Sequence, residues 1–112
     1  MRLGSIALAR VQQSHVMMKS RPVVVLQEMP PFSDYLVCAV SSQLRQECKG
    51  FGEVIAVQDP DFQNSGLKVS SLIRLGLVAT LPQSAFLGSL GAISARRLGG
   101  LTSRLAAHIS GP

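Results

Sequence analysis

The chain of 112 residues contains no tryptophan, and aromatic residues make up only 4% of it. Proteins that bind single strands of nucleic acid without sequence preference usually stack the bases on aromatic side chains. This composition argues against such a stacking platform. Any recognition of bases would rest on hydrogen bonds, loop shape and contacts to phosphate.

Metal-ligating and disulfide-forming residues are also scarce. The two cysteines, Cys38 and Cys48, are far apart and form neither a metal motif nor a disulfide framework, and His15 and His108 are isolated. Cys38 lies in an apolar run and is predicted to be a small buried residue. The sequence therefore predicts no metal, no cofactor and a reducing, cytoplasmic location.

Long apolar runs are missing as well. Prolines, glycines and polar residues interrupt the chain well before about 20 apolar residues, the length that a membrane-spanning helix needs. The apolar patch ahead of Arg10 is too short for a secretory signal. We therefore expect no membrane partner.

The chain is nevertheless rich in apolar residues. Hydrophobic residues make up 46% and the mean hydropathy is +0.30, which is typical of a folded rather than a disordered chain. The length predicts a single domain over residues 1–112. Only 15% of residues are charged, so part of the surface is expected to be covered by a partner or by a second copy, as in a homodimer.

The formal net charge of +5 comes mostly from eight arginines: Arg2, Arg10, Arg21, Arg45, Arg74, Arg96, Arg97 and Arg104. Guanidinium groups match the geometry of phosphate. The charge therefore favours a polyanionic partner, either nucleic acid or an acidic protein segment. The alternative on charge alone is a basic domain that binds no polyanion.

Hydrophobic patterns predict a mainly β fold of the α+β class. We expect strands over residues 6–11, 22–26, 35–40 and 53–57, and one strand or two strands divided at Gly76 over residues 67–81. Residues 12–20 are predicted to form a polar loop, and residues 29–31 and 59–61 to turn the chain. The predicted architecture is a small antiparallel barrel or curled sheet.

The end of the chain is predicted to be helical. Ser94 is a good N-cap residue, and Leu98, Leu101, Leu105 and Ile109 fall on one helical face. The arginines at 96, 97 and 104 lie elsewhere on the helix. Gly99 and Gly100 weaken it by roughly 1 kcal/mol each relative to alanine, so packing against the sheet must stabilise it.

Six short blocks, in this order, resemble the MazF/PemK toxins. The block from Lys19 resembles the family's Arg-Pro followed by an apolar strand, and the block from Ser65 resembles its Gly-Leu, then Ser, then Arg pattern. The blocks are GSIALA (4–9), KSRPVVVL (19–26), VCAVSSQL (37–44), SGLKVSSLIR (65–74), TL (80–81) and LGAIS (90–94). Each block is weak alone, but their order and spacing along almost the whole chain are much more specific.

The resemblance implies an SH3-like antiparallel barrel with a C-terminal helix, usually as a homodimer. It implies an endoribonuclease that cleaves single-stranded RNA without a metal, and a cognate antitoxin protein whose disordered tail wraps the toxin. The sequence departs from the family pattern at Ser5, where Asp is common, and in a shorter 12–20 loop. Gly76 stands where one branch of the family carries an acidic residue, two positions after the arginine.

RNA cleavage by its own 2′-hydroxyl requires stabilisation of the charge that develops on the phosphate oxygens. The sequence has no central histidine pair or carboxylate cluster, so arginines must supply that stabilisation. The resemblance and this chemistry select Arg21, Ser41 and Arg74 as candidate catalytic residues. The candidate RNA-binding residues are Lys19, Ser42 and Gln43.

Each candidate also has a purely structural interpretation. Arg21 is otherwise a solvated loop arginine, Ser41 a turn serine that caps the following segment, and Arg74 an outward-facing edge charge. Ser71 is expected to serve the fold through a hydrogen bond to the backbone. Lys19, Ser42 and Gln43 are otherwise ordinary exposed loop residues.

Three functions are compatible with these residues. The first is the ribonuclease toxin, which Arg21 and the block around Ser41 favour. The second is a non-enzymatic poison like the CcdB toxins, which share the fold, and Gly76 favours it. The third is an inactive fold relative that binds a protein partner.

Overall fold

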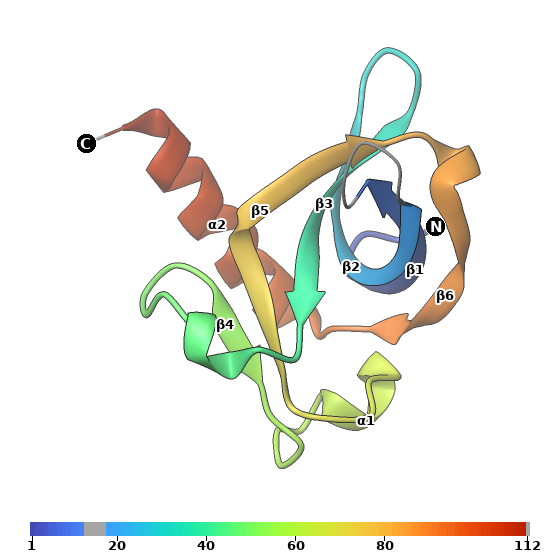
Figure 1. The fold of residues 1–112 in the computed structure, drawn as a ribbon. Coiled ribbons are helices and arrows are strands. Elements are labelled where there is room, and N and C mark those ends of the chain that lie inside the picture. The colour runs from blue at the N-terminus through green and yellow to red at the C-terminus, as the bar shows by residue number, and fades with distance from the viewer. Residues whose placement is uncertain (13–17, 112) are drawn as a thin grey trace.

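The computed structural model describes residues 1–12 and 18–111 and consists of one antiparallel sheet with a long C-terminal helix (Figure 1). The strands are β1 (Ser5–Gln12), β2 (Met18–Met29), β3 (Asp34–Ser41), β4 (Glu53–Ile55), β5 (Ser71–Leu81) and β6 (Phe86–Ala92). The helices are α1 (Phe62–Ser65) and α2 (Ala95–Ser110), with 3₁₀ turns at Leu44–Gln46 and Gln83–Ala85. The predicted α+β, mainly β class is confirmed.

The six strands follow the order β4-β5-β3-β2-β1-β6. All neighbouring strands that pair are antiparallel. Within the described residues the ladder ends at β4 on one edge and β6 on the other, so the sheet is open. Of the two predicted architectures, the sheet therefore takes the curled form, which Figure 1 shows wrapping around the interior.

Three strands, β2, β4 and β5, differ from the prediction by two or more residues at one end at least. β2 begins at Met18, so residues 18–20 belong to a strand rather than to the predicted loop, while residues 13–17 lie outside the described residues. Pro22 sits within β2 opposite Leu8 of β1, and pairing with β3 begins only at Val23. Proline is tolerated there because one side of the strand lacks a neighbour. β4 is shorter than predicted and ends at Ile55.

Of the two alternatives for residues 67–81, the single strand is observed, although it begins at Ser71 and carries a bulge near Gly76. β5 runs without interruption, but Cys38 of β3 pairs with Val78 while the next residue, Ala39, pairs with Arg74. Residues 75–77 are therefore extra residues on β5. Such bulges bend a strand and redirect its side chains.

β6 was not predicted at all. Its sequence, FLGSLGA, contains two glycines, and most of its residues are exposed, so it lacks a clear alternation of buried and exposed positions. It forms through pairing with β1, with two shifts of register. Only this tertiary contact makes the segment a strand.

The core consists of two clusters on opposite faces of the sheet. The predicted alternation of β3 is confirmed, because Cys38 and Val40 join one cluster while Tyr35 and Val37 join the other. The first cluster joins one face of the sheet to α2, which contributes Leu101 and Leu105. Its other members are Ile6, Val24, Leu26, Cys38, Val40, Ile55, Ile73, Leu75 and Ile93. The second contains Ala7, Ala9, Val23, Val25, Tyr35 and Val37, with Leu81 and Phe86 packed against it.

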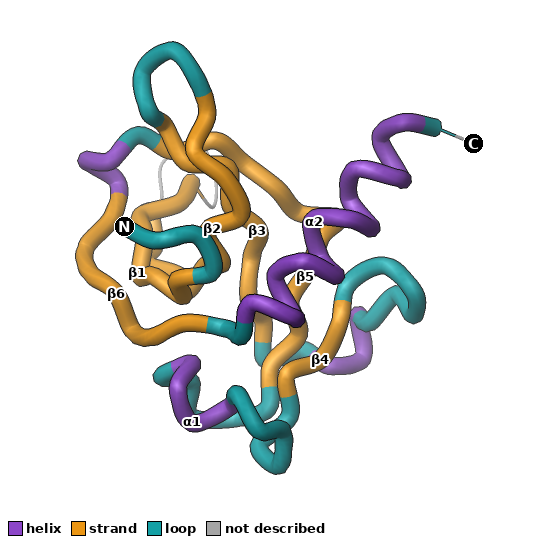
Figure 2. Tube along the Cα trace, turned by 180° about the vertical axis from the view of Figure 1, so that it is seen from behind, coloured by secondary structure: helices purple, strands orange, loops and turns teal. Residues whose placement is uncertain are grey.

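α2 begins as predicted. The Ser94 side chain accepts a hydrogen bond from the backbone N–H of Arg97 at 3.1 Å, which confirms the N-cap. Leu101 and Leu105 are buried, but Ile109 is 74% exposed, so the predicted apolar face is wrong in the last turn. Figures 1 and 2 give the reason, because the C-terminal end of α2 projects beyond the sheet.

Candidate functional site

A cavity of about 760 Å³ lies beside the second core cluster and brings five of the six predicted site residues together. The cavity and the second core cluster share three residues, because the cavity is lined by Val23 and Val37 of that cluster and by Leu81, which packs against it. The predicted residues that line it are Arg21 from β2, Ser41 from β3, Ser42 and Gln43 from the turn that follows, and Arg74 from β5. We call this cavity the arginine pocket.

The charge of the arginine pocket has one sign. Arg21, Lys68 and Arg74 line it, and no aspartate or glutamate does. Most of the remaining lining is apolar. A low-dielectric wall beside like charges strengthens the attraction of an anion.

Arg21 is held by a strand. It is the fourth residue of β2 and lies opposite Ala9 of β1. Alternation places it on the same face as Val23, whose side chain is buried. The interpretation of Arg21 as a loop arginine is therefore wrong, since β2 begins at Met18. The paired strand gives its exposed side chain a more rigid base.

Arg74 lies at the bulge of β5. Its position opposite Ala39 of β3 places it on the face of the arginine pocket, while its neighbours Ile73 and Leu75 enter the first core cluster. Its side chain is half-buried, and within residues 1–12 and 18–111 no hydrogen bond or ion pair reaches it. A partly desolvated cation without a partner is costly, and an anion in the pocket would offset that cost.

Ser41 has part of the structural role that its alternative interpretation gave it, because it bonds within the turn but, in the described part of the chain, no side chain caps the 3₁₀ turn at Leu44–Gln46. Its Oγ accepts a hydrogen bond from the backbone N–H of Gln43 at 3.0 Å. A hydroxyl that accepts one bond still has its own hydrogen to donate. Ser71 donates from Oγ to the carbonyl oxygen of Val69 at 2.8 Å, which confirms its expected role in the fold.

Two positions differ from the sequence-based prediction of the site. Lys19 does not line the arginine pocket, although it lies two residues before Arg21 and opposite Val11, which does. Lys68 lines the pocket but was not predicted. Its only signal in the sequence was its place between Gly66-Leu67 and the strand that carries Arg74.

Gly76 does not line the arginine pocket, although Leu77 beside it does. A Cβ built at this position would come within 3.9 Å of the Phe51 ring, on an exposed stretch of β5. The bulge explains this, because it breaks the alternation that would place residues 74 and 76 on the same face. The rim next to the pocket is apolar instead, with Val69, Leu77 and Val78 each more than 40% exposed.

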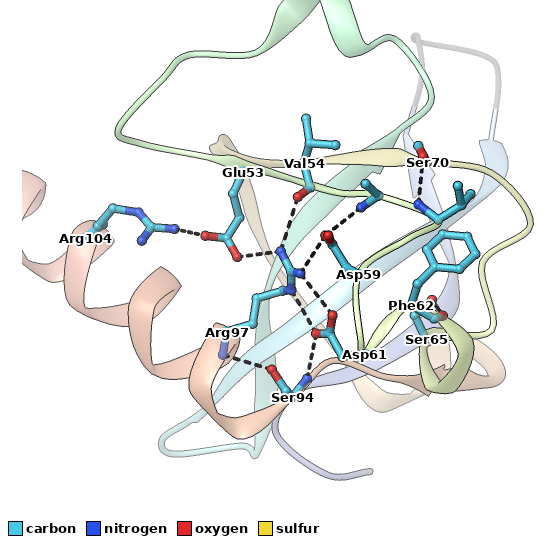
Figure 3. Close-up of polar contacts among 12 residues, drawn as sticks. Glu53, Val54, Asp59, Asp61, Phe62, Ser65, Ser70, Ser94, Arg97 and Arg104 are labelled. Carbon is cyan, nitrogen blue, oxygen red and sulfur yellow. Dashed lines mark hydrogen bonds and ion pairs between the residues drawn. The ribbon is translucent and has the colours of Figure 1, made fainter.

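A second polar cluster surrounds Arg97 and does not contribute to the arginine pocket (Figure 3). The Arg97 guanidinium donates to Glu53 at 2.8 Å, Asp59 at 3.1 Å and Asp61 at 2.9 Å. Arg104 donates to the other oxygen of Glu53 at 2.6 Å and to the carbonyl oxygen of Phe51 at 2.8 Å. These bonds join α2 to β4 and to the turn after it.

This ion-pair cluster was missed by the sequence analysis, which treated all arginines as available to a polyanion. It uses three of the six acidic residues and only two of the eleven basic ones. The acidic residues outside it are Glu28, Asp34 and Glu47. The positive charge is therefore concentrated on the rest of the protein, where the arginine pocket lies.

The two cysteines are free thiols. Cys38 is buried as predicted, and burial raises its pKa to about 12. Across the described ranges, no group of three or more His, Cys, Asp or Glu side chains is arranged to hold a metal ion. The absence of a metal and of a cofactor from the reaction stays a prediction.

No helix in the described part of the chain has the length and apolar character needed to cross a bilayer.

Comparison with known proteins identifies one family. The model of the PemK-like, MazF-like toxins of type II toxin–antitoxin systems matches residues 2–109, which include every lining residue of the arginine pocket. Comparison with curated proteins gives no match. A family match over nearly the full length agrees with the order of the short blocks in the sequence. The chain therefore belongs to the PemK-like, MazF-like toxin family of type II toxin–antitoxin systems.

Proposed function

We propose that this toxin is an endoribonuclease that cleaves single-stranded RNA in the arginine pocket without a metal cofactor. The observation that carries the proposal is Arg74, a half-buried cation without a partner in the described structure, in a pocket that Arg21 also lines and no carboxylate does. Such a site favours an anion, and a phosphodiester is the anion that the family's activity supplies.

Each candidate has a defined task in this reaction. The 2′-hydroxyl of RNA attacks the adjacent phosphorus and passes its proton to solvent, while negative charge grows on the non-bridging oxygens. The bond from phosphorus to the 5′-oxygen breaks and that oxygen takes a proton from solvent, which leaves a 2′,3′-cyclic phosphate and a 5′-hydroxyl. Arg21 and Arg74 stabilise that charge through N–H donors that are already in place. Ser41 donates its O–H to a phosphate oxygen, since the bond from the N–H of Gln43 uses only one lone pair of Oγ and leaves the hydroxyl hydrogen available.

The remaining lining residues hold the RNA. Lys68, Ser42 and Gln43 contact the phosphates or bases on either side of the cleaved bond. The apolar rim formed by Val69, Leu77 and Val78 covers a base. In other RNA-binding proteins aromatic side chains stack on the base instead. Lys19 attracts the strand from just outside the pocket.

The test is cleavage of labelled single-stranded RNA in EDTA by the wild type, Arg21→Ala and Arg74→Ala. Loss of one such donor typically slows a reaction by about 100- to 1,000-fold. Both residues lie outside the core clusters, so stability is expected to change by about 1 kcal/mol or less. Arg96→Ala is the matched control, since it removes the same charge from an exposed position near the ion-pair cluster.

Equal rates for Arg74→Ala, Arg96→Ala and the wild type would remove the pocket from the mechanism. A wild type that cuts no RNA in any of a broad set of sequences, but still arrests growth, would favour the non-enzymatic alternative.

Two partners belong to the proposal. The family implies an antitoxin. The excess of basic residues outside the ion-pair cluster suits an acidic antitoxin segment that folds on binding. The affinity of this segment should fall as the salt concentration increases. Co-purification with the product of the neighbouring reading frame checks this. We also propose a homodimer that covers exposed apolar side chains, and a sedimentation mass near the monomer's 11.9 kDa at micromolar concentration would contradict it.

A further inference from the structure

The side-chain amide of Gln43 is hydrogen-bonded on one side at the edge of the arginine pocket. Its side-chain oxygen Oε1 accepts a hydrogen bond from Nη1 of Arg45, in the 3₁₀ turn after β3. A guanidinium has only donors, so the amide oxygen of Gln43 must be the atom that faces it. The amide nitrogen Nε2 then faces elsewhere and presents N–H donors only.

The backbone of this turn is hydrogen-bonded as well. The N–H of Gln43 donates to Oγ of Ser41 at 3.0 Å, and the N–H of Gln46 donates to the carbonyl oxygen of Gln43 at 3.0 Å. Gln43 lines the pocket directly after Ser41 and Ser42, next to the proposed site of cleavage. A side chain at this place is well positioned to contact a base beside the cleaved phosphate.

We propose that Gln43 is a specificity-determining residue that selects a base with a keto oxygen, uracil or guanine, and that Arg45 is its positioning residue. This inference rests on the proposed function of the same pocket. Uracil O4 and guanine O6 accept hydrogen bonds at the position where cytosine N4 and adenine N6 donate them. At that position, a donor-only Nε2 pairs with the first two bases and leaves its N–H unpaired against the other two.

The effect is conditional on Arg45. A glutamine amide that is free to rotate offers either its oxygen or its nitrogen, so it accepts both kinds of base. Arg45 removes that freedom by occupying the oxygen. The selectivity therefore belongs to the pair of residues, although only Gln43 touches RNA.

The experiment measures binding, so that it does not depend on cleavage. The probes are 2′-fluoro oligouridylate and oligocytidylate of about ten nucleotides, which lack the attacking 2′-hydroxyl and cannot be cut by this route. Fluorescence anisotropy gives a Kd for each, and the ratio of the two Kd values is the readout. We expect the wild type to prefer oligouridylate by about 2- to 12-fold, the range that one net hydrogen bond produces at a side chain that is exposed in the unbound protein.

Three variants separate the explanations. Gln43→Glu replaces the donor by an acceptor and should reverse the preference towards oligocytidylate. Arg45→Met removes a charge, which weakens both complexes alike, but it should bring the ratio close to one because the amide can then rotate. Gln46→Glu adds the same charge in the same turn outside the pocket lining, and its ratio should equal that of the wild type.

The outcomes distinguish this inference from the proposed function. A wild type that binds both probes equally, or a Gln43→Glu variant with an unchanged ratio, would overturn the inference alone. A wild type that prefers oligouridylate but does not cut RNA would support the inference and overturn the ribonuclease. A protein that binds neither probe would overturn both.

Discussion

Arg97 and Asp61 form a bidentate ion pair that fastens the C-terminal helix to a turn 36 residues earlier (Figure 3). Nε of Arg97 donates to Oδ2 of Asp61 at 2.9 Å, and Nη2 donates to Oδ1 at 3.0 Å. Oδ2 also accepts from the backbone N–H of Ser94 at 3.2 Å, so the same carboxylate serves the first turn of α2. Both side chains are less than 15% exposed. The pair therefore joins two parts of the fold in a place that water reaches poorly.

Replacing Arg97 should destabilise the fold strongly. Arg97→Ala leaves Asp61 without its main partner, and we expect the free energy of unfolding to fall by about 2–4 kcal/mol, because a poorly solvated charge loses its compensation. Urea unfolding followed by circular dichroism measures it. Arg96→Ala, the exposed neighbour on the same helix, is the control and should change stability by about 0.5 kcal/mol or less. Equal transitions for the two variants would show that the cluster contributes no stability.

The same pair predicts a loss of stability in acid. The hydrogen bond from Arg97 lowers the pKa of Asp61 from 3.8 to about 2. Because the folded-state pKa lies below the unfolded one, this stabilisation is complete above about pH 4 and disappears as the pH falls towards about 2. It amounts to about 2 kcal/mol.

Unfolding free energies at about pH 6, 4 and 2 for the wild type and Asp61→Asn test this dependence. The variant should be less stable near neutral pH, and the difference between the two proteins should shrink towards pH 2. A difference that stays constant with pH would contradict the assignment to Asp61.

Two glycines of β6 should respond differently to the same substitution. A Cβ at Gly91 would lie 2.2 Å from the carbonyl oxygen of Asn64 in α1, whereas a Cβ at Gly88 meets nothing within 4 Å. We expect Gly91→Ala to cost about 1–3 kcal/mol, since backbone must move apart. Gly88→Ala should be neutral or slightly stabilising. Thermal melting of the two variants compares them directly, and similar melting temperatures would mean that α1 does not press against β6.

A carboxylate at position 76 should not change the activity. Gly76→Asp restores the acidic residue that one branch of the family carries, but this position does not line the arginine pocket, and its Cβ would make only an ordinary contact of 3.9 Å with the Phe51 ring. We expect normal folding and a cleavage rate within about threefold of the wild type, since a group outside the pocket adds little to transition-state stabilisation. Single-turnover cleavage of the RNA substrate measures it. A rise of more than about tenfold would show that the side chain reaches the reacting phosphate.

Local features of the sequence determined much of the secondary structure. The alternation in residues 35–40 predicts β3 and the faces of its side chains, because a paired strand exposes successive residues to opposite sides. Ser94 and the leucine spacing predict α2, since capping and helical periodicity depend on residues only a few positions apart. The same local blocks identified Arg21, Ser41 and Arg74, which the fold brings into one pocket.

Contacts between distant residues decided the rest. The bulge of β5 depends on the register against β3, and beside this bulge Arg74 lines the pocket while Gly76 does not. The carboxylates that pair with Arg97 and Arg104 lie 36 to 51 residues away along the chain. No local pattern therefore distinguishes these two paired arginines from Arg74. β6 exists because β1 offers an edge to pair with, and its own residues carry little preference for a strand. Sequence patterns predict the local structure that residues a few positions apart determine. The charge and shape of the arginine pocket depend instead on which strands lie side by side.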